Sequence, residues 1–323
     1  RSAQSAQSLV KSDAVIETQA MTEEAVEKAE DKSKIFFFDE WSKSSQKYLK
    51  NWCRIRVESA ESQSPVLHTS TIQTRRLGHK IQQDIAQILN LKAIRKRLSD
   101  GTDFDFDAAL DQQIERRAIA NPTDRIYEKR TSIQQDYAFC ILVDGSLSTD
   151  SYVSGIRVND LIKDSLHVLR YALEDFEQTT TVLSFRSFTR SDCRVTKLKD
   201  WSDPWQKVPG RIETLTPDGF TRLGPALRYA AHTLNQQSAK TRFLFVLSDS
   251  KPTDYDAYEG QHGLADVNRA IQEAHAGDSV VHAFILSDER SSRFNDLYGP
   301  GRFDYLLDIN RIGPTLTHLL RRR

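Results

Sequence analysis

Carboxylate and hydroxyl side chains follow the first buried-looking apolar run of the sequence. Residues 137–143 form that run, and Asp144, Ser146 and Ser148 come directly after it with one residue between successive members. This spacing can place one carboxylate and two hydroxyls in a single loop, and hard oxygen ligands of this kind suit Mg²⁺. The same residues can instead form Asx or hydroxyl turns and cap the next helix, so the motif alone leaves both interpretations open.

Two more polar residues stand at comparable points later in the chain. Asp249 follows a second apolar run at residues 242–247, and Thr221 lies in a Gly-Phe-Thr-Arg loop before a predicted helix at residues 223–234. In a doubly wound sheet, ligands bind beyond the carboxyl ends of the strands. We therefore expect these loops to lie next to the loop that carries Asp144.

The elements that would position these residues alternate between strand and helix from residue 136 onward. The predicted strands are residues 137–143, 180–185, 193–198, 242–247 and 279–286. The predicted helices are residues 156–176, 223–234, 267–276 and 312–320. Continuous apolar strands separated by helices indicate a parallel sheet covered on both faces. Residues 134–323 are thus predicted to form an α/β domain with a Rossmann-like, doubly wound, mostly parallel sheet.

The part of the chain before residue 134 has a different composition. Residues 1–33 are rich in Ser, Ala, Gln, Glu and Lys, which indicates a flexible linker or a solvated helix. Residues 34–133 are predicted to form a mainly helical extension. Its aromatic segments at residues 34–41 and 48–57 predict a pair of strands or a docking segment, and its predicted helices are residues 71–91 and 108–117. The opening RSAQSAQS lacks a methionine, so we expect the chain to be the end of a longer polypeptide.

Composition restricts the partners and the compartment. Lys plus Arg and Asp plus Glu number 45 each, so no global charge favours nucleic acid or an anionic membrane. The apolar runs are too short to cross a bilayer. The three cysteines, Cys53, Cys140 and Cys193, form neither a CxxC pair nor a disulfide framework, which favours a reducing compartment. We expect a cytoplasmic protein without nucleic-acid partners or membrane insertion.

Taken together, the order Asp-x-Ser-x-Ser, then Thr, then Asp resembles the metal ion-dependent adhesion site of von Willebrand factor A (VWA) domains. The resemblance covers roughly residues 135–323 and implies a VWA fold that binds Mg²⁺, with Mn²⁺ or Ca²⁺ possible. It implies that Ser146, Ser148 and Thr221 are direct ligands and that Asp144 and Asp249 act through water. A position would stay open for a carboxylate from a partner, because few direct anionic ligands leave the ion electron-poor.

A second resemblance lies beside these loops. Residues 250–260, SKPTDYDAYEG, are similar to the GKPNDYDxYEG signature of the NorD/CbbO family, with Ser250 and Thr253 where glycine and asparagine are usual. Residues 103–109 and 125–127 resemble that family's approach to the first strand. The resemblance implies an adaptor for a hexameric MoxR-type AAA+ ATPase. Such an adaptor would recruit a target enzyme, such as Rubisco or nitric oxide reductase, by gripping an acidic site through Mg²⁺.

The signature segment is expected to lie beside the ion and to contribute to partner selectivity. Arg222, which follows Thr221, can reinforce the binding of an acidic ligand. An ordinary solvent-facing arginine without a binding role is an equal alternative. The residues predicted to contact the partner are Arg222, Lys251, Asp254, Tyr255 and Tyr258.

The sequence offers less support for catalysis. Ser148 replaces the second glycine of a Gly-x-Ser-x-Gly nucleophile elbow, and the chain has neither a P-loop nor a Gly-x-Gly-x-x-Gly after its first strand. A haloacid dehalogenase-like phosphatase would need an aspartate where Ser146 stands. The predicted function is therefore not enzymatic. The alternatives are a metal-dependent hydrolase and a structural interaction module with an incidental metal site.

Overall fold

The computed structural model describes residues 34–61, 72–89, 136–249 and 251–322, and the backbone alone of residues 93–98, 103–104 and 127–131. The linker predicted at residues 1–33 and the helix predicted at residues 108–117 lie outside the described residues. Within the described part of the chain, no helix combines the length and the apolar character needed to cross a membrane.

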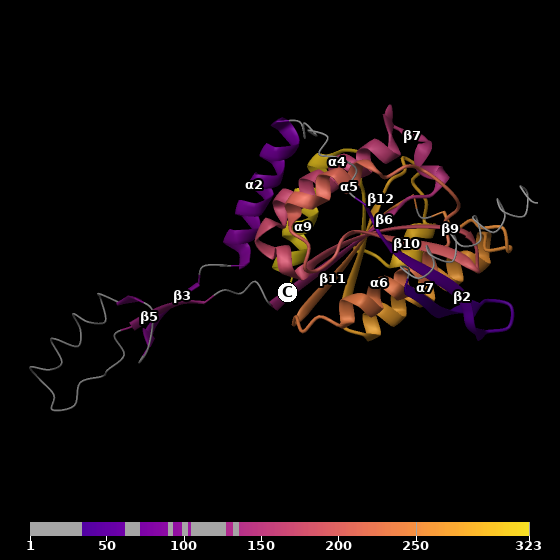
Figure 1. The fold of residues 1–323 in the computed structure, drawn as a ribbon, viewed down its shortest axis with the longest axis horizontal. Helices are drawn as coiled ribbons and strands as arrows, with labels where there is room; N and C mark the ends of the chain where they lie inside the picture. Colours follow the sequence, from indigo (N-terminus) through magenta and orange to yellow (C-terminus); the bar gives the residue numbers. More distant parts are fainter. Residues whose placement is uncertain are drawn as a thin grey trace, which may run out of the picture.

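A mostly parallel sheet of eight strands forms the centre of the molecule (Figure 1). Its order is β1-β2-β10-β9-β6-β11-β12-β13, in which only the β1–β2 and β9–β10 pairs are antiparallel. When the strands of this sheet are numbered in chain order from β6 as strand 1, the stretch from β10 to β13 reads 3-2-1-4-5-6. This is the doubly wound strand order. The predicted α/β class is thus confirmed. The strands are β1 (Lys34–Ser42), β2 (Lys47–Ser59), β6 (Tyr137–Asp144), β9 (Thr180–Thr189), β10 (Asp192–Lys199), β11 (Thr241–Ser248), β12 (Ser279–Ile285) and β13 (Phe303–Tyr305).

Helices cover both faces of this sheet. Helices α2, α4, α5 and α9 lie on one side in Figure 1, and α6 and α7 lie on the other. Successive residues of β6 enter the two cores alternately, because side chains of a strand point to opposite faces. Phe139 and Ile141 face the first core, and Ala138 and Cys140 face the second. The helices are α2 (Ile72–Leu89), α4 (Val158–Ala172), α5 (Val208–Glu213), α6 (Leu223–Asn235), α7 (Gly260–Ala276), α8 (Arg293–Tyr298) and α9 (Ile312–Arg321).

Shorter elements complete the described chain. A small sheet has the order β3-β5-β4, and a hairpin is formed by β7 and β8. These strands are β3 (Ala93–Leu98), β4 (Asp103–Phe104), β5 (Tyr127–Thr131), β7 (Tyr152–Val153) and β8 (Ile156–Arg157). The 3-10 helices are η2 (Leu147–Asp150), η3 (Glu174–Thr179), η4 (Trp205–Lys207) and η5 (Ile309–Arg311). The helix predicted at residues 156–176 is shorter than expected, because its start is the β8 strand and its end is the 3-10 turn of η3.

The two aromatic segments near the N-terminus are strands, as predicted, but they belong to the central sheet. Strand β2 pairs in parallel with β10, and its buried Ile55 and Val57 join the same core as Cys193 and Val195 of β10. Helix α2 likewise buries Ile81 in the core of the opposite face. Strands β1 and β2 and helix α2 therefore share the sheet and its cores with the elements that follow residue 133, where the domain boundary was predicted.

Helix α2 approaches α4 closely at Gly78. A Cβ atom at this position would lie 2.5 Å from the Cβ atom of Tyr171 and 2.9 Å from the carbonyl oxygen of Val168. We expect Gly78→Leu to lower the free energy of unfolding by about 1–3 kcal/mol, because the larger side chain forces the helices apart. Urea denaturation measures this change. The control is Lys80→Leu on the exposed side of α2, which is expected to change the free energy of unfolding by no more than about 0.5 kcal/mol. Equal effects of the two variants would contradict the close approach of α2 to α4.

Candidate metal-binding site

The carboxylates of the predicted site stand at the carboxyl ends of neighbouring strands. Strand β6 ends at Asp144, and the adjacent parallel strand β11 ends at Ser248, directly before Asp249. Asp144 accepts hydrogen bonds from the amide of Ser146 at 2.9 Å and from the hydroxyl of Ser248 at 2.6 Å. Ser148 in turn donates to the carboxylate of Asp249. The sheet therefore brings both predicted carboxylates together, as the strand order requires.

The three predicted hydroxyl groups converge on one point. The Oγ atoms of Ser146 and Ser148 lie 2.9 Å apart, and Thr221 Oγ1 donates to Ser146 Oγ at 2.8 Å. Ser146 and Thr221 are buried, whereas Ser148 is exposed. The cluster is thus closed on its inner side and open to solvent at Ser148.

Backbone contacts hold the loop of Thr221 against the motif loop. Thr221 and Thr253 exchange both backbone hydrogen bonds, at 2.9 and 3.1 Å, and the amide of Leu147 donates to the carbonyl of Gly219 at 3.0 Å. Gly219 has a φ of +72°, a left-handed conformation that favours glycine. A Cβ atom there would also lie 2.5 Å from the carbonyl oxygen of Ser187. This glycine is therefore what lets the threonine loop pass close enough to complete the cluster.

Electrostatics inside the cluster favour a cation. Burial and the nearby charge of Asp249 raise the pKa of Asp144 to about 7, and burial also raises the pKa of Asp249. Two buried carboxylates that face each other repel, and a bound cation removes that penalty. The donor set of two carboxylates and three hydroxyls consists of hard oxygens, which fits Mg²⁺. Across the described residues, no group of three or more His, Cys, Asp or Glu side chains is placed to hold a metal.

Three of the five residues predicted to contact a partner lie in the interior. Arg222, Asp254 and Tyr258 are 1%, 5% and 0% exposed. The expectation that their side chains touch a partner is therefore wrong. Lys251 and Tyr255 are exposed as expected; Lys251 pairs with Glu289 at 3.3 Å.

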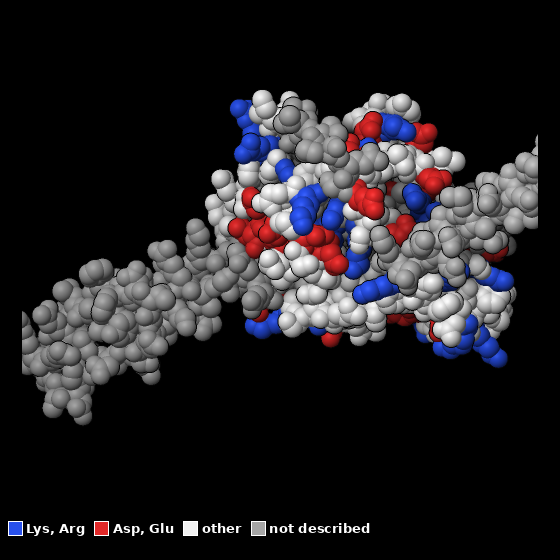
Figure 2. All heavy atoms as spheres, in the orientation of Figure 1, with Lys and Arg blue, Asp and Glu red and all other residues white. Residues whose placement is uncertain are grey.

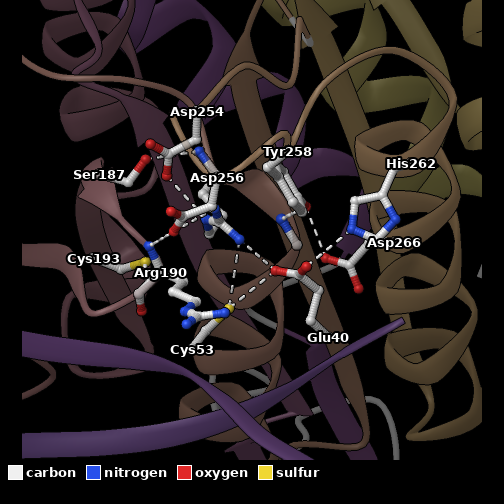
Figure 3. Close-up of polar contacts among 12 residues, drawn as sticks. Glu40, Cys53, Ser187, Arg190, Cys193, Asp254, Asp256, Tyr258, His262 and Asp266 are labelled. Atoms are coloured by element: carbon white, nitrogen blue, oxygen red, sulfur yellow. Dashed lines mark hydrogen bonds and ion pairs between the residues drawn. The ribbon is translucent and has the colours of Figure 1, made fainter. Parts of the chain in front are cut away.

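Arg222 is the centre of a buried ion cluster (Figure 3). Its Nη1 donates to Glu40 at 2.5 Å, its Nε to Asp254 at 2.9 Å and its Nη2 to Asp256 at 3.4 Å. The guanidinium also lies 4.4 Å from the ring centre of Tyr258. Burial alone would lower the pKa of Arg222, but the charges of Glu40 and Asp254 outweigh it and raise the pKa. The arginine is buried because three carboxylates neutralise it, so it is not available to an outside ligand.

The same cluster continues into helices α6 and α7. The hydroxyl of Tyr258 donates to Asp266 at 2.7 Å and accepts from the amide of Gly224 at 3.1 Å. Asp266 also accepts a hydrogen bond from the backbone amide of Trp41 at 2.8 Å and forms an ion pair with Arg228 at 2.8 Å. The signature segment, residues 250–260, is thus bonded to Arg222 and to helices α6 and α7, and strand β1 contacts Arg222 through Glu40 and Asp266 through Trp41. These contacts fix the loop that carries Thr253 next to Thr221 of the candidate metal site.

Sequence reasoning missed the carboxylates that hold Arg222 and Tyr258. Glu40 is 2% exposed and contacts Arg222 across 182 positions of sequence, and Asp266 is fully buried. Glu40 had a visible signal, since it is a charged residue inside the aromatic run KIFFFDEW. Asp266 lies in residues 263–267, which resemble a further segment of the NorD/CbbO family, but no pattern there marks this aspartate as buried.

The chain is similar in sequence to proteins named NorD. It is 29% identical over 285 residues to a NorD protein of Brucella suis, an alignment that covers 88% of this chain and 45% of that protein. The NorD protein of Stutzerimonas stutzeri is 26% identical over 225 residues, which is 69% of this chain and 37% of that protein. An uncharacterised protein of Pseudomonas aeruginosa is 33% identical over 241 residues, 73% of this chain and 39% of that protein. The chain spans less than half the length of these relatives, and no family model matches it.

Solved structures with a similar outline include one von Willebrand factor type A protein and a minor pilin. A von Willebrand factor type A protein from Catenulispora acidiphila aligns with a TM-score of 0.41 and 16% identity, over 60% of this chain and 43% of that one. The PilB minor pilin of Streptococcus sanguinis aligns with a TM-score of 0.44 and 14% identity, over 58% and 62%. At these scores the fold assignment rests on the strand order described above.

Proposed function

We propose that this chain is a metal-dependent protein-binding module that recruits a target to a MoxR-type AAA+ ATPase. The observation that carries the proposal is the convergence of three hydroxyls and two buried carboxylates at the carboxyl end of the sheet. The cluster opens to solvent at Ser148, where an outside ligand has access. A closed structural metal site would leave no such opening.

In this proposal each residue of the cluster has a distinct task. Ser146, Ser148 and Thr221 hold Mg²⁺ directly, and Asp144 and Asp249 hold its waters. Mg²⁺ keeps several waters and binds few protein carboxylates, so it retains a high affinity for a carboxylate from outside. The metal supplies the attraction for an acidic side chain, and the chain's own residues place it at an accessible edge.

The adaptor role is supported by the similarity to NorD proteins and by the signature segment at residues 250–260. In the proposed division of work, a hexameric ATPase supplies the force and this module selects the cytoplasmic target. An acidic site on an enzyme such as nitric oxide reductase or Rubisco is the kind of ligand that the cluster suits. The module itself catalyses no reaction.

A pull-down from cell lysate tests this proposal. Wild-type protein in Mg²⁺ is expected to recover an AAA+ ATPase and a large enzyme. The enzyme should be lost with Asp144→Asn or with EDTA. Asp218→Asn is the matched control, because it removes an exposed carboxylate from a residue whose backbone amide bonds to Gly145 of the motif loop. Identical partners in every condition would instead favour an interaction module whose metal site is incidental.

A further inference from the structure

Three arginines lie side by side across neighbouring strands of the central sheet. Strands β2, β10 and β9 follow one another in the sheet order (Figure 1). Arg56 of β2 is the register partner of Arg194 of β10, and Arg194 is the register partner of Arg186 of β9. Ile35 of the edge strand β1 is in turn the partner of Arg56. Register partners point to the same face of a sheet, so the three arginines form one line. We call Arg56, Arg194 and Arg186 the arginine row.

The arginine row lies on the face of the sheet opposite helix α6. The apolar residues that flank it along the three strands belong to the core that contains α6; they are Ile55, Val57, Phe185, Cys193 and Val195. Because successive side chains of a strand point to opposite faces, the arginines point away from that core. The side chains of Arg186 and Arg194 are 28% and 30% exposed, and Ile35 at the end of the row is 40% exposed. This part of the sheet therefore presents an accessible basic surface.

The carboxylates that the described residues place beside the row neutralise only part of its charge. Asp192 accepts two hydrogen bonds from Arg194, at 3.0 and 2.7 Å. Asp218 lies 4.0 Å from Nη1 of Arg186, whose Nε is buried without a hydrogen-bond partner in the described chain. Glu58 and the additional Arg54, two residues to either side of Arg56 on β2, cancel each other. Like charges directly opposite on neighbouring strands destabilise a sheet, so the row favours a ligand that brings several carboxylates to this face.

A segment of complementary charge precedes strand β1 in the same chain. Residues 22–31, TEEAVEKAED, lie outside the described residues and contain five carboxylates and one lysine. The carboxylates belong to Glu23, Glu24, Glu27, Glu30 and Asp31. At about 100° per residue, a helix of this sequence places all five within an arc of about 120°. The spacing therefore suits a helix that turns one continuous acidic side towards a basic surface.

The acidic segment also matches the row in position and length. Strand β1 begins at Lys34, so only two residues separate the segment from the strand whose Ile35 borders the row. Ten residues of helix are about 15 Å long. The three spacings between the four strands β1, β2, β10 and β9 add up to about 14 Å. A helix of residues 22–31 therefore spans the row from the edge strand to Arg186.

We propose that residues 22–31 form a helix that docks by its acidic side on the arginine row of the same chain. The carboxylates nearest β1, Glu30 and Asp31, then lie towards Arg56, and Glu23 at the far end lies towards Arg186. The docked helix covers the basic face of the sheet that α6 leaves open. This interaction surface shares no residue with the five donors of the candidate metal site, so it goes beyond the proposed function and does not depend on it.

Hydrogen exchange of the intact chain, followed by mass spectrometry, tests this proposal. At low ionic strength the amides of residues 22–31 should exchange about tenfold more slowly in the wild type than in the triple variant Glu23→Gln, Glu27→Gln, Glu30→Gln, because several ion pairs are lost together. Glutamine has nearly the helix propensity of glutamate, so the variant removes charge and little else. The double variant Arg56→Gln, Arg186→Gln should lose the same protection. In 1 M salt the wild type should lose most of it, since the Debye length falls to about 3 Å.

The matched control for the arginine variant is Arg75→Gln, Arg76→Gln, which removes two exposed arginines of α2 outside the row and should leave the protection unchanged. The glutamate variant alters no residue of the sheet, so it decides the result even where the arginine variant is unstable. Equally fast exchange of residues 22–31 in the wild type and in the glutamate variant would overturn the proposal. So would protection that survives in a folded arginine variant, because the segment then docks elsewhere. Protection that rises with protein concentration would assign the row to a second copy of the chain and refute docking within one chain.

Discussion

Arg222→Met is expected to lower the free energy of unfolding by about 3–5 kcal/mol. The arginine side chain has no exposed surface and neutralises Glu40 and Asp254, whose side chains are 3% and 0% exposed. Removing it leaves Asp254 without a counter-charge and leaves Glu40 with the imidazole of His262, 3.0 Å away, as its remaining ionisable partner. The lost packing on Tyr258 adds to the penalty. Urea or guanidinium denaturation followed by circular dichroism measures the change. The adjacent Thr221 should also lose its position, so metal affinity should fall as well.

The matched control for this variant is Arg194→Met. Arg194 also pairs bidentately with an aspartate, Asp192, but their side chains are 30% and 32% exposed. Its loss is expected to change stability by no more than about 1 kcal/mol. Adding Glu40→Gln to Arg222→Met should restore part of the loss, because one buried charge is removed. Equal effects of the two arginine variants would show that the cluster is not sealed from solvent.

Saturating Mg²⁺ is expected to stabilise the wild type and not Asp144→Asn. At about 100 times Kd, a ligand that binds only the folded chain adds about 2.7 kcal/mol to the free energy of unfolding. Asn keeps the size of the side chain and can still bond Ser146 and Ser248, so its fold should be retained. In EDTA the variant is expected to be at least as stable as the wild type, because one of two facing carboxylates is gone. Denaturation curves in Mg²⁺ and in EDTA measure both effects.

Asp218→Asn serves as the control for this experiment, since Asp218 is an exposed carboxylate outside the cluster. It should respond to Mg²⁺ as the wild type does. An equal Mg²⁺ effect on Asp144→Asn would place the binding site elsewhere. No effect on the wild type would refute metal binding by these five residues.

The buried ion cluster changes how the signature segment is understood. From the sequence, its residues Lys251, Asp254, Tyr255 and Tyr258 are candidates for partner contacts. In the structure, Asp254 bonds to Arg222 before α6, and Tyr258 bonds to Gly224 of α6 and to Asp266 of α7. Of Asp254, Tyr255 and Tyr258, Tyr255 alone faces solvent. On the face shown in Figure 2, basic and acidic side chains are interspersed, in line with equal totals of the two charges.

Local patterns in the sequence were enough to predict the central strands and to place five oxygen-bearing residues at one edge of the sheet. A run such as residues 137–143 is continuously apolar because both faces of a central parallel strand are buried. Loops at the carboxyl ends of such strands meet at one edge, so Asp144, Thr221 and Asp249 could be placed together before their contacts were known. Both inferences depend on short-range periodicity and on the connection rules of α/β sheets.

Only the tertiary structure decided where the N-terminal strands pair and whether Arg222 is buried or exposed. Nothing local to residues 34–59 specifies that β2 pairs with β10, because strand pairing depends on which edge remains open once the sheet is assembled. An arginine beside Thr221 is ordinarily solvated, and its burial becomes favourable only when Glu40, Asp254 and Asp256 arrive from two other segments. Charge neutralisation between distant residues is a property of the assembled fold. It makes Arg222, which was predicted to contact a partner, a buried residue that supports the loops of the candidate site.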